Sequence, residues 1–442
     1  MAVLIAVAVT IAIALGRLAL LRLRTRSTSP CRVVFVHPDL GLGGAERLVV
    51  DMALALQRRG HAVTVYTSHH DPARSFDETH DGRLEVVVRG DWLPRTLCGR
   101  CHILCALLRG ISLTCSLLWL ERARARGARV AVVDQLSAPV PLLRLMGMRV
   151  IFYCHFPDKL LVQHAATGLR SAAKRAYRVP FDALEEACTG CAHRVLVNSA
   201  FTQRVYATAF PLLRRVRTPP SVLHPCVDIE RQQPLAPAEC AERVTFLSLN
   251  RYERKKNVAL ALRALAALPP GHRARARLAV AGGYDKRVRE NVEHLAELRA
   301  LAAELGIGEL VAFHRSVSEA ERQALLRGAL AVVYTPTDEH FGIVPLEAMA
   351  AARAVVAAKS GGPLETIRDG ETGFLCEPTA LAMAAALRAC IDAPARAVRM
   401  GEAGRARVCM HFSAEPFGDR LERVVDQVDV GIEWPDAGAQ CR

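Results

Sequence analysis

The stretch from Leu330 to Met349, LAVVYTPTDEHFGIVPLEAM, joins an apolar run to a helical pattern through a short charged loop. The run from Leu330 to Pro336 is typical of a strand buried inside a parallel sheet. Pro345 occupies a position that suits the first turn of a helix. The pattern predicts that Glu339 lies on the loop at the carboxyl end of the strand and that Glu347 lies in the first turn of the helix.

Glu339 and Glu347 are separated by seven residues that include Phe341 and Gly342. Ligands of open α/β sheets bind outside the carboxyl ends of the strands, so both carboxylates are predicted to face one cleft. Each glutamate alone has a simpler interpretation. Glu347 would complement the helix macrodipole, and Glu339 would be a solvated loop charge. The spaced pair is more specific than either residue.

Outward from this stretch, apolar runs alternate with helical patterns, which indicates two doubly wound α/β domains. The predicted strands of the first domain are Val33–Val36, Ala62–Thr67, Leu84–Val88, Val130–Asp134, Val150–Tyr153 and Val195–Asn198. Those of the second are Val244–Leu249, Leu278–Ala281, Leu310–His314, Leu330–Tyr334 and Ala354–Ala357.

The polar segment Glu230–Pro237 is the predicted linker, and the amphipathic pattern Pro416–Val428 predicts a helix that packs back across the first domain. We therefore divide the chain into an anchor at 1–26, Rossmann-like domains at 27–229 and 230–412, and a returning helix with a polar tail at 413–442.

The 442 residues carry a net charge of +14, which favours anionic partners such as phospholipid headgroups or phosphorylated substrates. No recognisable nucleic-acid-binding motif accompanies this charge, so nucleic acid is not an expected partner. The 51% hydrophobic content excludes a disordered protein.

The segment Ala2–Leu15 has no charged residue, and the basic residues follow it rather than precede it. A cleaved signal peptide has its basic region first. We therefore predict an uncleaved membrane anchor with the body of the protein in the cytosol; a tail lying in the membrane interface is the alternative. A cytosolic body keeps the 14 cysteines reduced.

The apolar stretch Ile103–Leu120 is predicted to be a helix of the first domain rather than a second membrane span. Whether this helix contacts the membrane does not follow from the sequence.

Three further motifs follow predicted strands. Gly43 and Gly44 precede a helix and let the backbone approach an anion, although a tight strand–helix turn is the simpler interpretation. Arg251 and Lys256 lie in a run of cations before a helix whose predicted N-cap is Asn257. Cations are unfavourable at a helix N-terminus, so a bound diphosphate would offset their repulsion; a solvated basic loop is the alternative.

His155 ends the fifth predicted strand and is suited to donate to a phosphate or a sugar hydroxyl, while a structural histidine is the commoner case. No Asp-x-Asp pair occurs in the chain, so we expect charge neutralisation by basic side chains without an essential divalent metal or other cofactor.

Together, the motifs GGAER (43–47), YCHFP (153–157), Arg251 with Lys256, Glu339-x₇-Glu347 and GGP (361–363) resemble glycosyltransferase family 4 from about Arg32 to Val428. The resemblance implies a GT-B fold, with two Rossmann-like domains facing across a cleft. It also implies a retaining transfer of mannose from GDP-mannose to a dolichol-diphosphate-linked oligosaccharide, through α-1,3 and α-1,6 linkages, on the cytosolic face of the endoplasmic reticulum membrane. A complex with neighbouring transferases of the same pathway is a further implied partner.

Carried over to this sequence, the resemblance implies that Arg251 and Lys256 hold the donor diphosphate and that Glu347 binds the ribose hydroxyls. Glu339 would contact the mannose hydroxyls, and His155 would meet the same sugar from the other domain. The backbone of Phe341, Gly342, Ile343 and Val344 would lie beside the sugar and phosphate, and Gly43 and Gly44 would line the cleft near the phosphate or the acceptor. Two alternatives stay open: a related transferase with another lipid acceptor, and a GT-B protein that binds nucleotide sugar or anionic lipid without catalysis.

Overall fold

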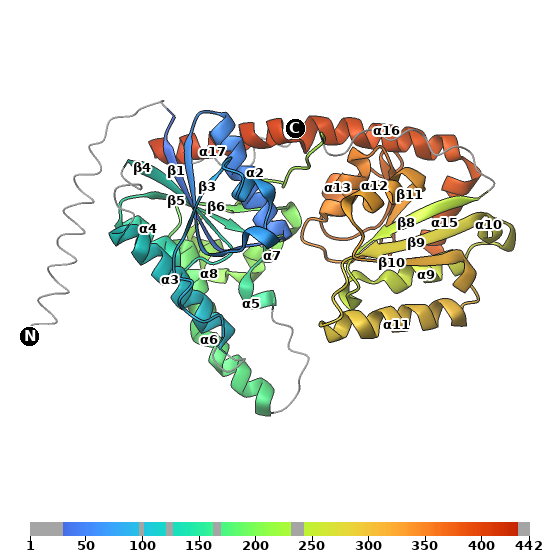
Figure 1. Cartoon of the computed structure of the whole chain (residues 1–442), viewed down its shortest axis with the longest axis horizontal. Coiled ribbons are helices and arrows are strands. Elements are labelled where there is room, and N and C mark those ends of the chain that lie inside the picture. The colour runs from blue at the N-terminus through green and yellow to red at the C-terminus, as the bar shows by residue number, and fades with distance from the viewer. Residues whose placement is uncertain (1–29, 97–100, 121–126, 162–168, 231–242, 432–442) are drawn as a thin grey trace, which may run out of the picture. The chain divides into compact units, whose positions relative to one another are not determined.

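A computed structural model of the chain describes residues 30–96, 101–120, 127–161, 169–230 and 243–431. The chain divides into two compact units, each built on one parallel sheet (Figure 1). The first unit comprises residues 1–198, 202–224 and 417–442, and the second comprises 199–201 and 225–416. The predicted anchor at 1–26 and most of the predicted linker lie outside the described residues. In the described part of the chain, no helix is long and apolar enough to cross a membrane.

The sheet of the first unit has the strand order β3-β2-β1-β4-β5-β6-β7. Its strands are β1 (Arg32–Leu40), β2 (Ala62–His70), β3 (Glu85–Val88), β4 (Ala128–Asp134), β5 (Arg149–Cys154), β6 (Arg194–Val197) and β7 (Ser221–Val222). The helices are α2 (Gly44–Arg58), α3 (His102–Trp119), α4 (Pro139–Leu145), α5 (Asp158–Leu161), α6 (Leu169–Gly190), α7 (Ala200–Ala209), α8 (Pro211–Val216) and, at the end of the chain, α17 (Ala414–Val430).

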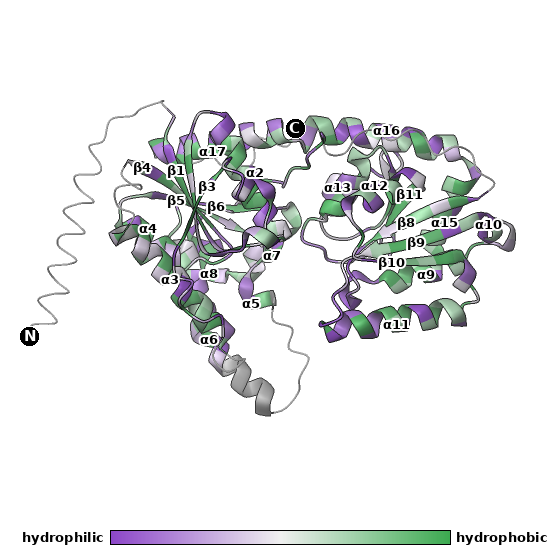
Figure 2. Cartoon of the chain, viewed as in Figure 1, coloured by the Kyte–Doolittle hydropathy of each residue, from purple (hydrophilic) through white to green (hydrophobic). Residues whose placement is uncertain are grey.

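Helices cover both faces of this sheet, so its central strands are buried on both sides. Val33, Val34, Phe35 and Val36 of β1 are all at most 3% exposed. This double burial explains why the strands read as nearly continuous apolar runs. Figure 2 shows the resulting pattern, with apolar strands inside and helices of mixed polarity around them.

The stretch predicted as a helix at Ile103–Leu120 forms α3 of the first unit. Arg109, the charged residue that interrupts its apolar sequence, is 6% exposed and lies 2.9 Å from Asp39 after the buried part of β1. The buried arginine therefore ties α3 to the carboxyl end of the sheet. Helix α17 is held to the first unit by ion pairs of Arg59 with Asp419 and of Arg129 with Asp429.

The sheet of the second unit has the order β10-β9-β8-β11-β12-β13. Its strands are β8 (Val244–Leu249), β9 (Ala276–Gly282), β10 (Val311–Arg315), β11 (Ala329–Tyr334), β12 (Ala354–Ala358) and β13 (Gly373–Cys376). Its helices are α9 (Val258–Ala266), α10 (Pro270–Arg275), α11 (Arg289–Glu304), α12 (Glu319–Gly328), α13 (Ile343–Ala350), α14 (Pro363–Thr366), α15 (Ala380–Asp392) and α16 (Pro394–His411).

Every predicted strand forms, and the two short strands β7 and β13 were missed. The prediction that Glu347 lies in the first turn of its helix was wrong. Gly342 adopts φ 78°, a left-handed conformation that glycine accepts readily, and the chain enters α13 directly after it. The helix therefore begins two residues before Pro345, and Glu347 lies in its second turn.

Candidate active site

The predicted donor-binding residues all follow neighbouring strands of the second unit. Strand β11 pairs with β8 on one side and with β12 on the other, and all three run parallel. Their carboxyl ends therefore lie at one edge of the sheet, which is where open α/β sheets bind ligands. Arg251 and Lys256 follow β8, Glu339 and Glu347 follow β11, and Gly361 follows β12.

Lys256 and Glu339, 83 residues apart, form an ion pair with Nζ 2.6 Å from Oε2. The lysine side chain is 14% exposed and the glutamate side chain 24%. The backbone supports the contact, because Thr335 Oγ1 donates to the carbonyl of Lys256 at 2.9 Å. The structure thus brings a predicted diphosphate ligand and a predicted sugar ligand together at the strand ends.

Glu347 is paired with Arg322 of α12, whose Nη2 lies 2.6 Å from Oε2. Burial raises the pKa of the Glu347 carboxyl, and the guanidinium of Arg322 opposes that shift. Arg322 was not predicted from the sequence, because it lies on a preceding helix with no motif around it. The charge of Glu347 is thus compensated by a specific partner on another helix.

The cations before α9 are compensated by carboxylates of the protein, which the sequence analysis did not anticipate. Arg251 lies 3.0 Å from Glu253, and Arg254 contacts Glu293 and Glu297 of α11. A bound anion is therefore not required to explain this basic run. Asn257 is the N-cap residue of α9, as predicted, but it adopts φ 48° and makes no side-chain cap hydrogen bond.

Two glycines after β12 support the loop that carries Glu339. The backbone N–H of Gly362 donates to the carbonyl of Glu339 at 2.9 Å. A Cβ on Gly361 would meet that carbonyl oxygen at 2.3 Å, and one on Gly362 would meet the carbonyl oxygen of Phe341 at 2.0 Å. No side chain fits between these two backbones, so the GGP motif fixes the acidic loop by direct contact.

The residues between the two glutamates divide into a buried and an exposed part. Phe341 is 5% exposed and packs in the core of the second unit, whereas Ile343 is 36% exposed at the start of α13. Val344 is half-buried. The first turn of α13 has backbone N–H groups without a helical partner, which favour an anion at this position.

In the first unit, His155 follows β5 and contacts Asp134. Its Nε2 lies 2.6 Å from Oδ1 of Asp134, the last residue of β4, and the histidine side chain is 22% exposed. The other carboxylate oxygen, Oδ2, lies 2.9 Å from Nδ1 of His37 on β1. Burial raises the pKa of Asp134, but the two histidines outweigh it and hold the pKa at about 2.

Gly43 precedes α2 and Gly44 is the first residue of that helix, at the same edge of the first sheet as His155. Gly43 is extended and precedes the helix, and a Cβ on it would meet the carboxylate of Glu46 at 2.2 Å. Space around Gly44 is open within 4 Å. The turn is therefore packed on one side and accessible on the other.

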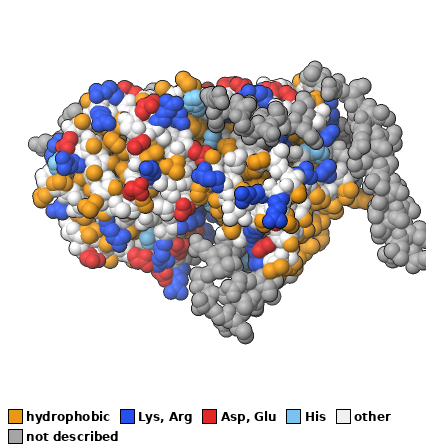
Figure 3. Space-filling view, turned by 180° about the vertical axis from the view of Figure 1, so that it is seen from behind, with side chains coloured by type: hydrophobic (Ala, Val, Ile, Leu, Met, Phe, Trp, Pro, Cys, Tyr) orange, Lys and Arg blue, Asp and Glu red, His pale blue; other side chains and the backbone are white. Residues whose placement is uncertain are grey.

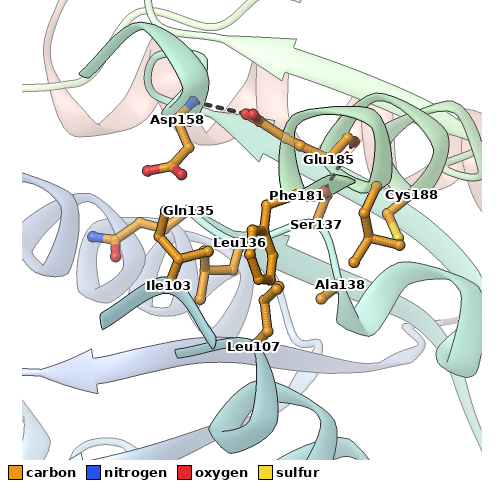
Figure 4. A pocket seen from close by; sticks show the side chains of 11 residues that line it. Ile103, Leu107, Gln135, Leu136, Ser137, Ala138, Asp158, Phe181, Glu185 and Cys188 are labelled. Atoms are coloured by element: carbon orange, nitrogen blue, oxygen red, sulfur yellow. Dashed lines mark hydrogen bonds between the residues drawn. The ribbon is translucent and has the colours of Figure 1, made fainter. Parts of the chain in front are cut away.

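A cavity of about 30 Å³ lies beside this edge in the first unit (Figure 4). Ile103 and Leu107 of α3, Leu136 after β4, and Phe181 of α6 form its apolar wall. Glu185 accepts the backbone N–H of Asp158 at 2.7 Å, and burial raises the pKa of Glu185 to about 7. Ser137, Asp158 and Glu185, three of its polar lining residues, thus have hydrogen-bond or ion-pair partners within the protein.

On the face shown in Figure 3, lysine and arginine side chains are interspersed with acidic and apolar ones. No cluster of three or more histidine, cysteine, aspartate or glutamate side chains arranged to hold a metal ion occurs in the described ranges.

Comparison with known proteins agrees with this geometry. A family profile described as "Glycosyltransferase Family 4" matches residues 42–231, and one described as "Glycosyl transferases group 1" matches residues 233–407. The fold is similar to that of sucrose-phosphate synthase from Thermosynechococcus elongatus, with a TM-score of 0.71 and 21% identity over 91% of this chain and 100% of that one. It is also similar to a glycosyltransferase from Rickettsia africae, with a TM-score of 0.68 and 15% identity over 92% of this chain and 100% of that one. Fold and site together define a glycosyltransferase of the GT-B class.

Relatives of known name identify the family within this class of glycosyltransferases. The α-1,3/1,6-mannosyltransferase ALG2 of Homo sapiens is 45% identical over 90% of this chain and 96% of that protein. The enzyme of the same name from Rhizomucor pusillus is 44% identical over 91% of this chain and 93% of that protein. The chain belongs to the α-1,3/1,6-mannosyltransferase family.

Proposed function

We propose that the protein transfers mannose from GDP-mannose to a lipid-diphosphate-linked oligosaccharide, with retention of the α-configuration. The acceptors would be Man1GlcNAc2- and then Man2GlcNAc2-diphosphodolichol, giving the α-1,3 and α-1,6 linkages. Membership of the mannosyltransferase family supports the reaction. The observation that carries the proposal is the 2.6 Å contact of Lys256 with Glu339, which joins a diphosphate-type and a sugar-type ligand at one sheet edge.

In this proposal Arg251 and Lys256 hold the donor diphosphate and stabilise the departing GDP. Glu347 accepts from the ribose hydroxyls through the oxygen that Arg322 leaves available. Glu339 binds the mannose hydroxyls, the backbone of residues 341–344 lies beside the sugar and phosphate, and His155 contacts the same sugar. Gly43 and Gly44 approach the phosphate or the acceptor.

Retention arises when the acceptor hydroxyl attacks the anomeric carbon from the face that GDP leaves. The bond from the anomeric carbon to the diphosphate oxygen breaks, the bond to the acceptor oxygen forms, and the acceptor proton passes to the departing diphosphate. Double displacement with Glu339 as the nucleophile is the alternative. The Lys256 contact favours a binding role, because an ion-paired carboxylate is a weaker nucleophile.

Neutralisation of the diphosphate by these side chains requires no divalent cation. We further propose that catalysis takes place at the cytosolic face of the endoplasmic reticulum membrane. The enzyme would bind its lipid acceptor there, with residues 1–26 as the membrane anchor.

The decisive experiment incubates purified full-length protein with GDP-mannose and defined lipid-diphosphate acceptors, followed by mass and linkage analysis. We expect one mannose to be added to each acceptor, with turnover retained in EDTA. Transfer only to another lipid acceptor would instead favour a related transferase, and GDP-mannose binding without transfer to any lipid acceptor would favour a non-catalytic protein.

A further inference from the structure

Three residues from three neighbouring strands meet at the carboxyl edge of the first sheet. His37 lies on β1, Asp134 ends β4 and His155 follows β5, and these strands are adjacent in the sheet. The carboxylate of Asp134 stands between the two rings, with 2.9 Å to His37 and 2.6 Å to His155. His37 is 0% exposed and Asp134 is 1% exposed.

The surroundings of His37 determine how many protons it carries. Its Nδ1 faces a carboxylate oxygen of Asp134, and its Nε2 faces the backbone carbonyl oxygen of Asp39 at 3.1 Å. Both partners are acceptors, and neither can donate. A neutral imidazole has one donor and one acceptor nitrogen, whereas the imidazolium has two donors. The contacts of His37 are therefore satisfied only when both nitrogens are protonated.

We propose that His37 is a buried imidazolium that serves as a positioning residue for His155, acting through Asp134. The positive charge of His37 balances the carboxylate, which would otherwise be a buried charge without compensation. Asp134 Oδ1 in turn lies 2.6 Å from Nε2 of His155 without the geometry of a hydrogen bond, so the carboxylate acts on that ring through its charge. His155 need not itself be charged to stabilise Asp134, because His37 already balances the carboxylate.

The inference rests on the proposed function only through the contact of His155 with the donor sugar. A charge on His37 makes protonation of His155 less favourable, and the carboxylate makes it more favourable. Without His37, the carboxylate of Asp134 acts on His155 alone, and His155 takes up a proton at higher pH.

The remaining titratable and charged groups at this edge come from the surrounding elements: Asp39, Arg95, Arg109, Cys154, Asp158, Arg178 and Glu185. Asp39 is paired with Arg109, and Asp158 is paired with Arg178 at 3.3 Å. Burial raises the pKa of the Cys154 thiol well above its usual range, so this residue stays neutral. Substitution of His37 leaves these side-chain interactions in place.

The test compares the full-length protein with its His37→Gln variant. The pH profile of kcat for mannose transfer is expected to move to higher pH by about one unit or more, because opposite charges at this distance shift titration by about 1–3 units. His69→Gln is the matched control. His69 lies at the same sheet edge and pairs with Asp91 at 3.0 Å, away from Asp134, so its variant keeps the wild-type profile. A His37→Gln profile that coincides with the wild type contradicts the proposal.

A second measurement uses the unmodified protein and needs neither folding of a variant nor catalysis. In ¹⁵N-histidine-labelled full-length protein, one imidazole should show two protonated nitrogens from pH 6 to pH 8, protected from solvent exchange. If every solvent-protected histidine is a neutral tautomer at pH 7, the proposal is overturned. Failure of mannose transfer by the wild type would instead contradict the proposed function and leave this spectrum to decide the state of His37.

Discussion

At the scale of single residues, the ion pair of Lys256 and Glu339 makes each side chain depend on the other. Both are more than three-quarters buried, so removal of one charge leaves the other poorly compensated. The lysine is also the proposed diphosphate ligand. The charge of Glu339 therefore influences donor binding as well as the position of the sugar.

Glu339→Gln keeps the size and much of the hydrogen-bonding capacity of the side chain and removes its charge. We expect kcat/KM for mannose transfer to fall by about 100-fold or more, in line with loss of one electrostatic contact at a reacting centre. Glu377→Gln is the control, because Glu377 is 69% exposed and lies 3.9 Å from Lys359 at the surface. The measurement is initial-rate kinetics, with intact mass of the slow variant. Activity within a few-fold of wild type contradicts the role of Glu339, and a covalent mannosyl adduct contradicts same-face transfer.

Gly362→Ala tests the support of the acidic loop. The new Cβ would lie 2.0 Å from the carbonyl oxygen of Phe341, so the two backbones must move apart. We expect a stability loss of about 1–3 kcal/mol together with a strong decrease in transfer, measured by chemical unfolding and kinetics. Gly328→Ala, at the end of α12 with open space around it, is expected to be neutral or slightly stabilising. Equal effects of the two substitutions would show that the loop tolerates displacement.

The sequence is informative for residues that follow a strand within a motif, and uninformative for the partners that hold them. Glu339, Lys256 and His155 were found from their positions after apolar runs. Arg322 comes from a helix, so no periodic pattern marks it. Asp134 ended a predicted strand, which is itself a signal that a polar residue lies at the ligand edge. His37 was hidden because a histidine inside an apolar strand gives no indication of its charge.

At the scale of elements, α5 and α6 are joined through one carboxylate. Glu185 of α6 accepts the backbone N–H groups of Asp158 at 2.7 Å and Lys159 at 3.1 Å. These bonds satisfy the start of a helix that is only four residues long. Burial of the carboxyl outweighs the effect of these hydrogen bonds, which lower the pKa, and raises the pKa of Glu185 from 4.5 to about 7.

This shift predicts a pH dependence of stability. Between pH 4.5 and about 7 the unfolded chain releases the proton that folded Glu185 retains, so the contribution of this group to stability falls as pH rises and is constant above that range. Glu185→Gln is permanently neutral. We expect the two proteins to have similar stability near pH 5, and the variant to gain roughly 1–2 kcal/mol relative to the wild type by pH 8, after allowance for partial exposure. Unfolding curves at several pH values check this, and a difference that stays constant across the range would contradict the shift.

Helix α17 contributes buried apolar side chains to the first unit. Leu421 is 0% exposed, so Leu421→Ala is expected to cost about 2–5 kcal/mol. Met410→Ala on α16, where the side chain is 68% exposed, should change stability by less than about 0.5 kcal/mol. Trp92 and Trp119 are 78% and 82% exposed in the folded chain, so unfolding of the first unit in urea is followed by hydrogen–deuterium exchange of β1 rather than by fluorescence. An unchanged midpoint for Leu421→Ala would mean that α17 is not part of that cooperative unit.

Elements were more predictable from the sequence than their ends. Doubly buried strands give long apolar runs, and these located the strands of both sheets. The start of α13 was misplaced because Pro345 suggested an N-terminal position, while the left-handed Gly342 set the true one. Strand β7 has only two residues, and β13 is a four-residue strand that begins at a glycine, so neither gives a recognisable run.

At the scale of the whole molecule, one donor site would serve both proposed linkages. Lys256→Met should therefore reduce transfer to the Man1 and to the Man2 acceptor by the same factor, because the lost contact is to the shared donor. Separate kinetic assays with each acceptor and linkage analysis of the products test this. Loss of one linkage with retention of the other would require a second donor site.

The order of segments along the chain has a consequence for synthesis. The first unit begins at the N-terminus, but its last helix, α17, is encoded after the complete second unit. A ribosome therefore releases every strand of the second sheet before it releases the helix that buries Leu421 in the first. The first sheet therefore lacks the cover of α17 while nearly two hundred residues of the second unit are translated. Premature termination near residue 412 would thus leave the earliest-made unit unfinished and exposed to chaperones and proteases.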